Sequence, residues 1–490
     1  MSELASEPCR GARRVVVIGH GMAGARLAGE LRRHDPVAER VAVTVVGDEP
    51  HAAYNRVLLS GVLAGSLDLD AVRMQDISQR VDLRLGIAVT SVDRVRRSVR
   101  LADDTAVGYD TLVLATGARP WLPDVDGLLT EAGVLADGVS AFRSRDDCAR
   151  IVAGARPGTP VAVLGGGLLG LEAARGLAGR GCLVTVVHPN DHVLDRQLDP
   201  AAGHLLRRVL ERMGIEFRVG TTAVRYLPGD GMKLADGSHV PAELVVVSAG
   251  VRAETGLAMA AGLAVDRGVL VDDALRTNDP RVHAIGDCAQ HPATEAGLVQ
   301  PAFDQAAVLA ARLTGADPAA RYHGTPVVTR LKARDVDLAT MGDVHWDPAG
   351  DQPPGVEVVC VQDSARGRYG KLVLRDDRVI GAILLGLPDA AATITQFFDS
   401  GAPVPSDRLA LLLGRALPAE QGGPSAANLP DDALVCRCNT VHKAGIVAAW
   451  RDGARDVPAL ATATRATTGC GSCRNTVTDI VTWLAANQPA

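Results

Sequence analysis

"RRVVVIGHGMAGARLAGELRR", residues 13–33, predicts the fold of the amino-terminal part of this chain. The stretch begins as a buried apolar strand, turns at a glycine and continues as an amphipathic helix. Its glycines Gly19, Gly21 and Gly24 form the pattern G-x-G-x-x-G directly after the strand. The first glycine allows a tight turn, the second lets the backbone approach a pyrophosphate, and the third lets helix and strand pack closely. Because the helix N-terminus adds amide hydrogens and a positive dipole end, the stretch predicts a dinucleotide site.

A second strand, "VAVTVVGDEP" at residues 41–50, follows the helix and leads into Asp48. This carboxylate lies 24 residues beyond Gly24, where an acceptor for a ribose hydroxyl is expected. Strand, glycine turn, helix, second strand and acid together make a much more specific signal than the glycines alone.

The same arrangement recurs in "GTPVAVLGGGLLGLEAARGLAGRGCLVTVVHP", residues 158–189, with Gly165, Gly167 and Gly170 at the same spacing. Two such units predict two bound dinucleotides. The second strand of this unit ends at His188 instead of an acid. A carboxylate there would bind the ribose of NAD and repel a 2′-phosphate, whereas a histidine decides neither, so both NADH and NADPH stay open.

The totals restrict the classes of partner. With 490 residues the chain is expected to form two to four domains. Its 51 basic and 57 acidic residues give a formal charge of −6 without a long basic run, so neither a nucleic-acid partner nor a membrane partner is expected. The apolar run at 15–18 is too short for a signal peptide or a membrane span, and we expect a cytoplasmic protein with reduced thiols.

Two further strands frame the second unit: "YDTLVLATGARPWLP" at 109–123 and "VHAIGDCAQH" at 282–291. This order of motifs resembles the two-dinucleotide flavoproteins, the pyridine-nucleotide reductases, from residue 13 to about 410. The resemblance implies an α/β fold with two nested Rossmann-like domains, in which an NAD(P)H domain is inserted into an FAD domain.

The resemblance also implies roles for single residues. Asp287 would hydrogen-bond the ribityl chain of FAD, and Val89 would offer its backbone to the adenine. Glu172 matches a position close to the nicotinamide and is the candidate catalytic residue. The implied FAD-binding residues are Gly19, Gly21, Gly24, Asp48, Arg56, Val89, Thr116, Gly117 and Asp287. The implied NAD(P)H-binding residues are Gly165, Gly167, Gly170, Glu172, His188, Ala249 and Gly250.

The stretch "HAAYNRVLLSGVLAG", residues 51–65, stands where disulfide-reducing relatives carry a pair of cysteines, and it contains none. Disulfide reduction by that route is therefore not expected. Its segment "YNRVLLS" resembles flavoproteins that reduce ferredoxins and rubredoxins, in which the arginine, here Arg56, reaches the FAD. The longer segment "RVLLSGVLAG" resembles the flavoprotein part of assimilatory nitrite and nitrate reductases.

Four cysteines close the chain, in "ALVCRCNTVH" at 433–442 and "ATTGCGSCRN" at 466–475. They form C-x-C, a gap of 31 residues and C-x2-C, an all-sulfur pattern that suits either Zn²⁺ or an iron–sulfur cluster. The ligands would be Cys436, Cys438, Cys470 and Cys473. The tail resembles the small helical [2Fe–2S] domain named for bacterioferritin-associated ferredoxin, which implies a cluster; zinc cannot change oxidation state and would leave the flavin without an outlet.

These segments predict the following organisation. A small α+β C-terminal reductase domain, at the electron exit or a dimer face, and a linker rich in Pro and Gly separate the nested domains from the tail. The expected boundaries are 13–120 and 250–318 for the FAD domain, 121–249 for the NAD(P)H domain, 322–412 for the reductase domain, 413–431 for the linker and 432–488 for the [2Fe–2S] domain.

As a whole, the chain resembles electron-transfer subunits of assimilatory nitrate reductase. Because it ends soon after Cys473 without a sirohaem or molybdopterin domain, we expect the final acceptor to be another polypeptide, a molybdenum-containing nitrate reductase subunit. Supply to a sirohaem nitrite reductase or a monooxygenase is an alternative, as is a flavin subunit of an amine or amino-acid dehydrogenase. A redox-sensing module is the alternative without turnover, and a homo-oligomer is compatible with each.

Overall fold

The computed structural model describes residues 11–74, 77, 80–292, 297–415, 429–437, 439–468 and 473–487. The chain divides into two compact units. The first unit comprises Met1–Val57, Leu69–Trp121 and Val251–Thr325, and the second comprises Leu58–Asp68, Leu122–Gly250 and Pro326–Ala490.

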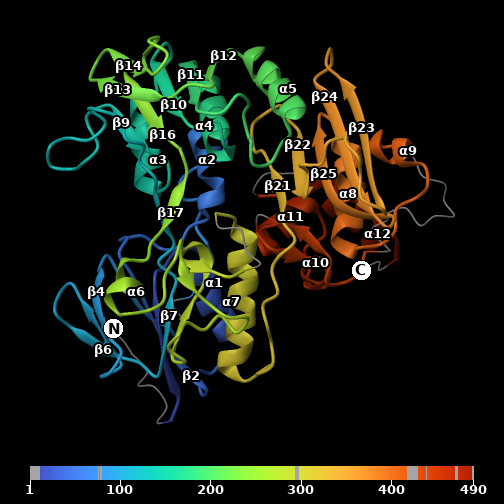
Figure 1. Cartoon of the computed structure of the whole chain (residues 1–490). Helices are drawn as coiled ribbons and strands as arrows, with labels where there is room; N and C mark the ends of the chain where they lie inside the picture. Colours follow the sequence, from blue (N-terminus) through green and yellow to red (C-terminus); the bar gives the residue numbers. More distant parts are fainter. Residues whose placement is uncertain are drawn as a thin grey trace. The chain divides into compact units, whose positions relative to one another are not determined.

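A parallel sheet of order β19-β7-β1-β2-β3 forms the centre of the first unit. Strand β7 and the later part of β1 are apolar and buried, as parallel strands covered on both faces must be, whereas the edge strand β3 is only half-buried. Helices α1 and α7 pack against each other beside it (Figure 1). The elements are β1 (Arg13–Ile18), α1 (Met22–His34), β2 (Val41–Gly47), β3 (Asp82–Leu85), β7 (Thr111–Leu114), β19 (Val282–Ala284) and α7 (Val299–Thr314).

Smaller elements complete this unit. An antiparallel sheet is inserted between β3 and β7, and the ribbon of β8 and β17 joins the point where the chain leaves the unit to the point where it returns. The elements are η1 (Arg56–Leu58, the last residue of which belongs to the second unit), β4 (Val89–Asp93), β5 (Ser98–Leu101), β6 (Ala106–Gly108), β8 (Ala118–Pro120), β17 (Val251–Ala253), α6 (Gly256–Ala260), β18 (Val269–Leu270), η2 (Gly286–Cys288) and β20 (Ala289–Gln290).

The second unit repeats the parallel architecture in a sheet of order β12-β11-β10-β16-β9. In both sheets the strand before the glycine turn lies between the strand that follows its helix and a strand from later in the chain. The elements are α2 (Leu59–Leu63), β9 (Val139–Ala141), α3 (Arg145–Gly154), β10 (Pro160–Leu164), α4 (Leu168–Gly179), β11 (Leu183–His188), α5 (Pro200–Glu211), β12 (Ile215–Val219), β13 (Ala223–Leu227), β14 (Gly231–Leu234), β15 (His239–Pro241) and β16 (Leu244–Val247).

An antiparallel sheet of order β21-β22-β25-β24-β23 follows, with α8 packed on it. A tight turn joins β24 to β25, and its residues Asp376 and Asp377 have φ of 48° and 62°. The elements are β21 (Val328–Arg330), β22 (Leu338–Gly342), β23 (Val356–Asp363), β24 (Arg368–Arg375), β25 (Arg378–Leu385), α8 (Pro388–Ser400) and α9 (Arg408–Leu412).

The carboxyl-terminal tail has a small core of its own, which contains Cys436, Trp450, Cys473 and Ile480. In the described part of the tail, three helices follow a short hairpin, in agreement with the resemblance to a small helical domain. The elements are β26 (Leu434–Cys436), β27 (Val441–His442), α10 (Lys443–Arg451), α11 (Val457–Thr464) and α12 (Arg474–Asn487). Among the residues that the structure describes, every helix is too short or too polar to span a lipid bilayer.

Candidate functional site

The first glycine turn lies between β1 and α1, and each of its three glycines has a separate role. Gly19 has φ +112°, and a Cβ there would overlap the carbonyl oxygen of Ala115. A Cβ on Gly24 would overlap the carbonyl oxygen of Gly19, so helix and strand can approach only without a side chain. At Gly21, in contrast, a Cβ would meet no atom within 4 Å. This open space at the start of α1 fits a pyrophosphate.

A second turn, 265 residues farther along the chain, packs against the same helix start. Gly286 has φ +74°, and a Cβ there would lie 2.9 Å from the Cβ of Ala23. The amide of Gly286 donates to Oε1 of Gln305, whose side chain is fully buried, over 2.8 Å. Asp287 follows, and its Oδ1 accepts a hydrogen bond from the Gly297 amide over 3.2 Å. The structure therefore places Asp287 next to the first glycine turn. This arrangement is required if Asp287 and the turn bind the same ligand.

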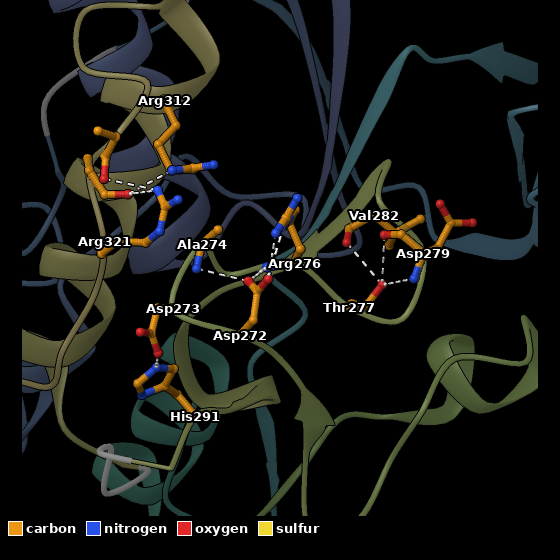
Figure 2. A network of polar contacts seen from close by, with 12 residues as sticks. Asp272, Asp273, Ala274, Arg276, Thr277, Asp279, Val282, His291, Arg312 and Arg321 are labelled. Atoms are coloured by element: carbon orange, nitrogen blue, oxygen red, sulfur yellow. Dashed lines mark hydrogen bonds and ion pairs between the residues drawn. The ribbon is translucent and has the colours of Figure 1, made fainter.

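Polar contacts fix the loop that leads to Asp287, and Figure 2 shows them. Asp272 accepts hydrogen bonds from the amides of Ala274 and Arg276, over 2.8 and 2.9 Å. Thr277 Oγ1 donates to the carbonyl oxygen of Val282 over 3.0 Å. Strand β19 starts at Val282 and leads directly to the turn with Asp287. The hydrogen bonds of the loop therefore fix the position at which this strand begins.

Two carboxylates, rather than one, stand at the end of β2. Asp48 is exposed, and its Oδ1 caps the amide of Glu49. Glu49 forms an ion pair with Arg56 and accepts a hydrogen bond from the Tyr54 hydroxyl over 2.8 Å. Burial alone would lower the pKa of Arg56, but Tyr54 and Glu49 beside it raise that pKa above its ordinary value. Glu49 is a candidate ligand that the sequence pattern missed, since only its neighbour has the expected spacing.

The remaining candidates of the first unit lie on its connections. Thr116 Oγ1 donates to the carbonyl oxygen of Glu254 over 2.8 Å, and the Glu254 amide donates to the carbonyl oxygen of Gly117. These bonds join the segment that leaves the first unit to the segment that re-enters it, next to the paired strands β8 and β17. Val89 begins β4 and is half-buried against the core of the unit.

The second glycine turn, between β10 and α4, repeats the first one in detail. A Cβ on Gly165 would overlap the carbonyl oxygen of Ser248, and a Cβ on Gly170 would overlap that of Gly165. Gly167 again faces open space at the start of the helix. The same three steric conditions in two unrelated stretches of the chain indicate the same kind of ligand.

Glu172 lies in α4 and is buried, with its side chain 2% exposed. Its Oε1 accepts hydrogen bonds from both the amide and the Nζ of Lys332, over 3.0 and 2.8 Å. The lysine lies 160 residues away between β21 and β22, and nothing in the sequence pattern points to it. Ala249 and Gly250 follow β16, at the carboxyl edge of the same sheet, and Gly250 has φ +121°.

His188 ends β11 and packs against the second glycine turn. Its Nδ1 accepts a hydrogen bond from the Gly166 amide over 3.1 Å, and a Cβ on Gly166 would lie 2.8 Å from its Cγ. Burial lowers the pKa of His188, although Asp195 beside it opposes the shift. The imidazole is therefore neutral at neutral pH.

Of the four tail cysteines, Cys436 and Cys473 are described; Cys438 and Cys470 lie outside the described residues. Cys436 ends β26 and Cys473 immediately precedes α12, and both are buried in the core of the tail. The Asn439 side-chain amide, 3.9 Å from the Cys436 sulfur, also donates to the carbonyl oxygen of Arg465. Thiols 37 residues apart in sequence thus share one small core, and such a donor set fits a thiolate-bound cluster.

Comparison with known families matches three parts of the chain. Residues 13–306 match the family described as pyridine nucleotide-disulphide oxidoreductase. Residues 327–402 match the rubredoxin NAD⁺ reductase C-terminal domain, and residues 434–483 match the BFD-like [2Fe–2S] binding domain.

Curated relatives and solved structures agree with these families. Nitrite reductase [NAD(P)H] of Bacillus subtilis (strain 168) is 33% identical over 96% of this chain and 58% of its own length. The assimilatory nitrate reductase electron transfer subunit of the same organism is 31% identical over 97% of this chain and 60% of its own length. This chain thus spans about three fifths of either relative. The covalent putidaredoxin reductase–putidaredoxin complex has a TM-score of 0.72 and 26% identity, over 84% of this chain and 97% of that one.

The expected α/β class with Rossmann-type domains and a small [2Fe–2S] domain is confirmed by these neighbours and matches. The expected cofactors FAD, NAD(P)H and a [2Fe–2S] cluster are likewise supported by the two matching families. The chain belongs to the pyridine nucleotide-disulphide oxidoreductase family.

Proposed function

We propose that this protein draws electrons from NAD(P)H and delivers them, through its tail, to a separate molybdenum-containing nitrate reductase subunit in the cytoplasm. The observation that carries the proposal is the joining of two dinucleotide turns and a buried cysteine core in one chain. When bound, the flavin takes both electrons of the nicotinamide and the [2Fe–2S] cluster gives them up singly.

In this proposal the residues of the chain bind and orient the two dinucleotides. Gly21 and Gly167 leave room at two helix starts, where amide hydrogens and the helix dipole hold pyrophosphates. Asp287, fixed by the Gln305-bound turn, is proposed to hold the ribityl chain of FAD. Asp48 and Glu49 offer carboxylates to the ribose at the end of β2.

Glu172 is proposed to position the nicotinamide half of the second site rather than to transfer a proton. Its carboxylate already accepts two hydrogen bonds from Lys332 and is nearly inaccessible. The pair links α4 to the segment after β21, so it would keep the helix that starts at the coenzyme in a fixed position. Hydride transfer requires such orientation and a dry pocket more than it requires an acid.

The names of the relatives bear on the choice of acceptor, and the first one favours nitrate reductase. One relative is an electron transfer subunit of assimilatory nitrate reductase, and another is a nitrite reductase that acts with NAD(P)H. The second name favours one alternative acceptor, a sirohaem nitrite reductase.

A tagged copy of the full chain, recovered from nitrate-grown host cells, tests the acceptor. We expect a molybdenum-containing protein to co-purify and NAD(P)H to support nitrate reduction by the mixture. Recovery of a sirohaem protein with NAD(P)H-dependent nitrite reduction would replace nitrate by nitrite in the proposal.

A cysteine variant tests the route. Cys470→Ser should keep most NAD(P)H–ferricyanide activity and lose delivery to the partner. The matched control Cys360→Ser changes an exposed cysteine of β23, outside the tail, and should keep both activities. Undiminished delivery by Cys470→Ser would show that the tail lies off the path.

A further inference from the structure

The adenosine end of the second dinucleotide site carries a feature that bears on the choice of coenzyme. In a unit of this topology the adenosine ribose lies beyond the end of the strand that follows the glycine helix, and an acid there usually accepts its 2′-hydroxyl. In this chain that strand is β11, and its last residue is His188.

The imidazole of His188 cannot provide a positive charge for a 2′-phosphate. Its Nδ1 accepts the hydrogen bond from the Gly166 amide, so the single ring proton of the neutral form sits on Nε2. The ring is 6% exposed and lies against the glycine turn. Its remaining nitrogen points away from that turn, toward Asp195.

A carboxylate nevertheless lies near the end of β11. It belongs to Asp195, which the sequence pattern does not place at the strand end. Asp195 Oδ1 is 3.2 Å from His188 Nε2, and Asp195 Oδ2 accepts a hydrogen bond from Asn190 Nδ2 over 2.7 Å. The intervening segment folds back because the Leu194 amide donates to the carbonyl oxygen of Gly166 over 3.0 Å. With its side chain 29% exposed, Asp195 is fixed and still open to a ligand.

We propose that Asp195, held by Asn190 and lying 3.2 Å from His188 Nε2, takes the place of the missing strand-end acid and makes the protein selective for NADH over NADPH. The carboxylate accepts the 2′-hydroxyl of NADH and repels the 2′-phosphate of NADPH. This inference rests on the proposed function only in that NAD(P)H is the electron donor, and it goes further by naming the coenzyme and the residue that selects it.

The test compares both coenzymes with the flavin-loaded full chain in steady-state reduction of ferricyanide, which requires no partner protein. We expect kcat/KM for NADH to exceed that for NADPH by on the order of 100-fold, because a like charge faces the phosphate. Equal values, or a preference for NADPH, would overturn the inference.

Variants identify the residue responsible. Asp195→Asn removes the charge with little change of shape and should reduce the NADH preference about tenfold, chiefly by lowering KM for NADPH. Asp195→Arg supplies a phosphate partner and should reduce the preference further. The matched control Arg196→Gln removes the neighbouring cation and should leave the ratio within about twofold of the wild type.

An unchanged ratio in Asp195→Asn would overturn the assignment of selectivity to Asp195, and a strong loss of NADPH use in Arg196→Gln would assign phosphate binding to the arginine instead. These outcomes are separate from failure of the proposed function. Flavin reduction by NADH without delivery to a molybdenum protein would contradict the proposed acceptor and leave the coenzyme ratio standing.

Discussion

Acidification should destabilise the first unit through one buried histidine, His283. This residue lies in β19, three residues before the Gly286 turn, and is 6% exposed. Burial lowers its pKa from 6.5 to about 4, although hydrogen bonds to the backbone of Ala274 and Leu275 oppose the shift. Because the folded pKa lies below the unfolded one, the unfolded chain binds more protons at acid pH. Stability is therefore complete above pH 6.5 and is lost as the pH falls toward 4.

The size of the loss follows from the two pKa values. A difference of about 2.5 units corresponds to about 3 kcal/mol in full, of which about 2 kcal/mol is lost between pH 7 and pH 5. Paired carboxylates titrate mostly below pH 5, so histidines dominate this interval, and a His283 variant separates this residue from the others.

Urea unfolding at pH 7 and pH 5, followed by the release of FAD fluorescence, measures the effect. His283→Gln keeps a polar side chain that does not titrate and should lose about 2 kcal/mol less than the wild type over this interval. The control His323→Gln replaces an exposed histidine of the same unit and should retain the wild-type pH dependence. Equal losses in the wild type and His283→Gln would refute the assignment.

Three further predictions concern the second unit and the tail. Gly167→Val places a side chain in the open space at the start of α4, so it should weaken coenzyme binding about 100-fold in a titration while the FAD content stays normal. Lys371→Met should cost about 3–5 kcal/mol in denaturant unfolding, because Lys371 is 1% exposed and its Nζ lies 2.9 Å from Asp199; adding Asp199→Asn should recover part of that loss. Cys473→Ser should remove iron from the purified protein by metal analysis while NAD(P)H still bleaches the flavin, whereas unchanged iron would exclude Cys473 as a ligand.

The sequence sufficed for features that depend on local sterics. Each G-x-G-x-x-G pattern states three steric conditions within six residues, and the structure meets all of them in both turns. Buried valine-rich runs likewise predict parallel strands directly, and the turn at Asp376 and Asp377 needs only residues that tolerate positive φ.

Contacts that depend on tertiary packing could not be predicted from the sequence. The lysine that binds Glu172 lies 160 residues away, and the glutamine that holds Gly286 lies on a different helix. Asp195 reaches the end of β11 only because its segment folds back onto the glycine turn. No periodicity records such contacts, since they depend on the path of a loop. Roles against bound cofactors, such as those expected of Arg56 and Val89, stay predictions.

In the proposed function, one chain carries electrons from a nicotinamide to iron held by its carboxyl-terminal cysteines. Electron paramagnetic resonance at low temperature, on holoprotein reduced anaerobically with NADH alone, tests this transfer. We expect the signal of a reduced [2Fe–2S] centre, with about two iron atoms per chain by metal analysis. Bound zinc, or a flavin bleached by NADH without any iron signal, would contradict the proposed transfer.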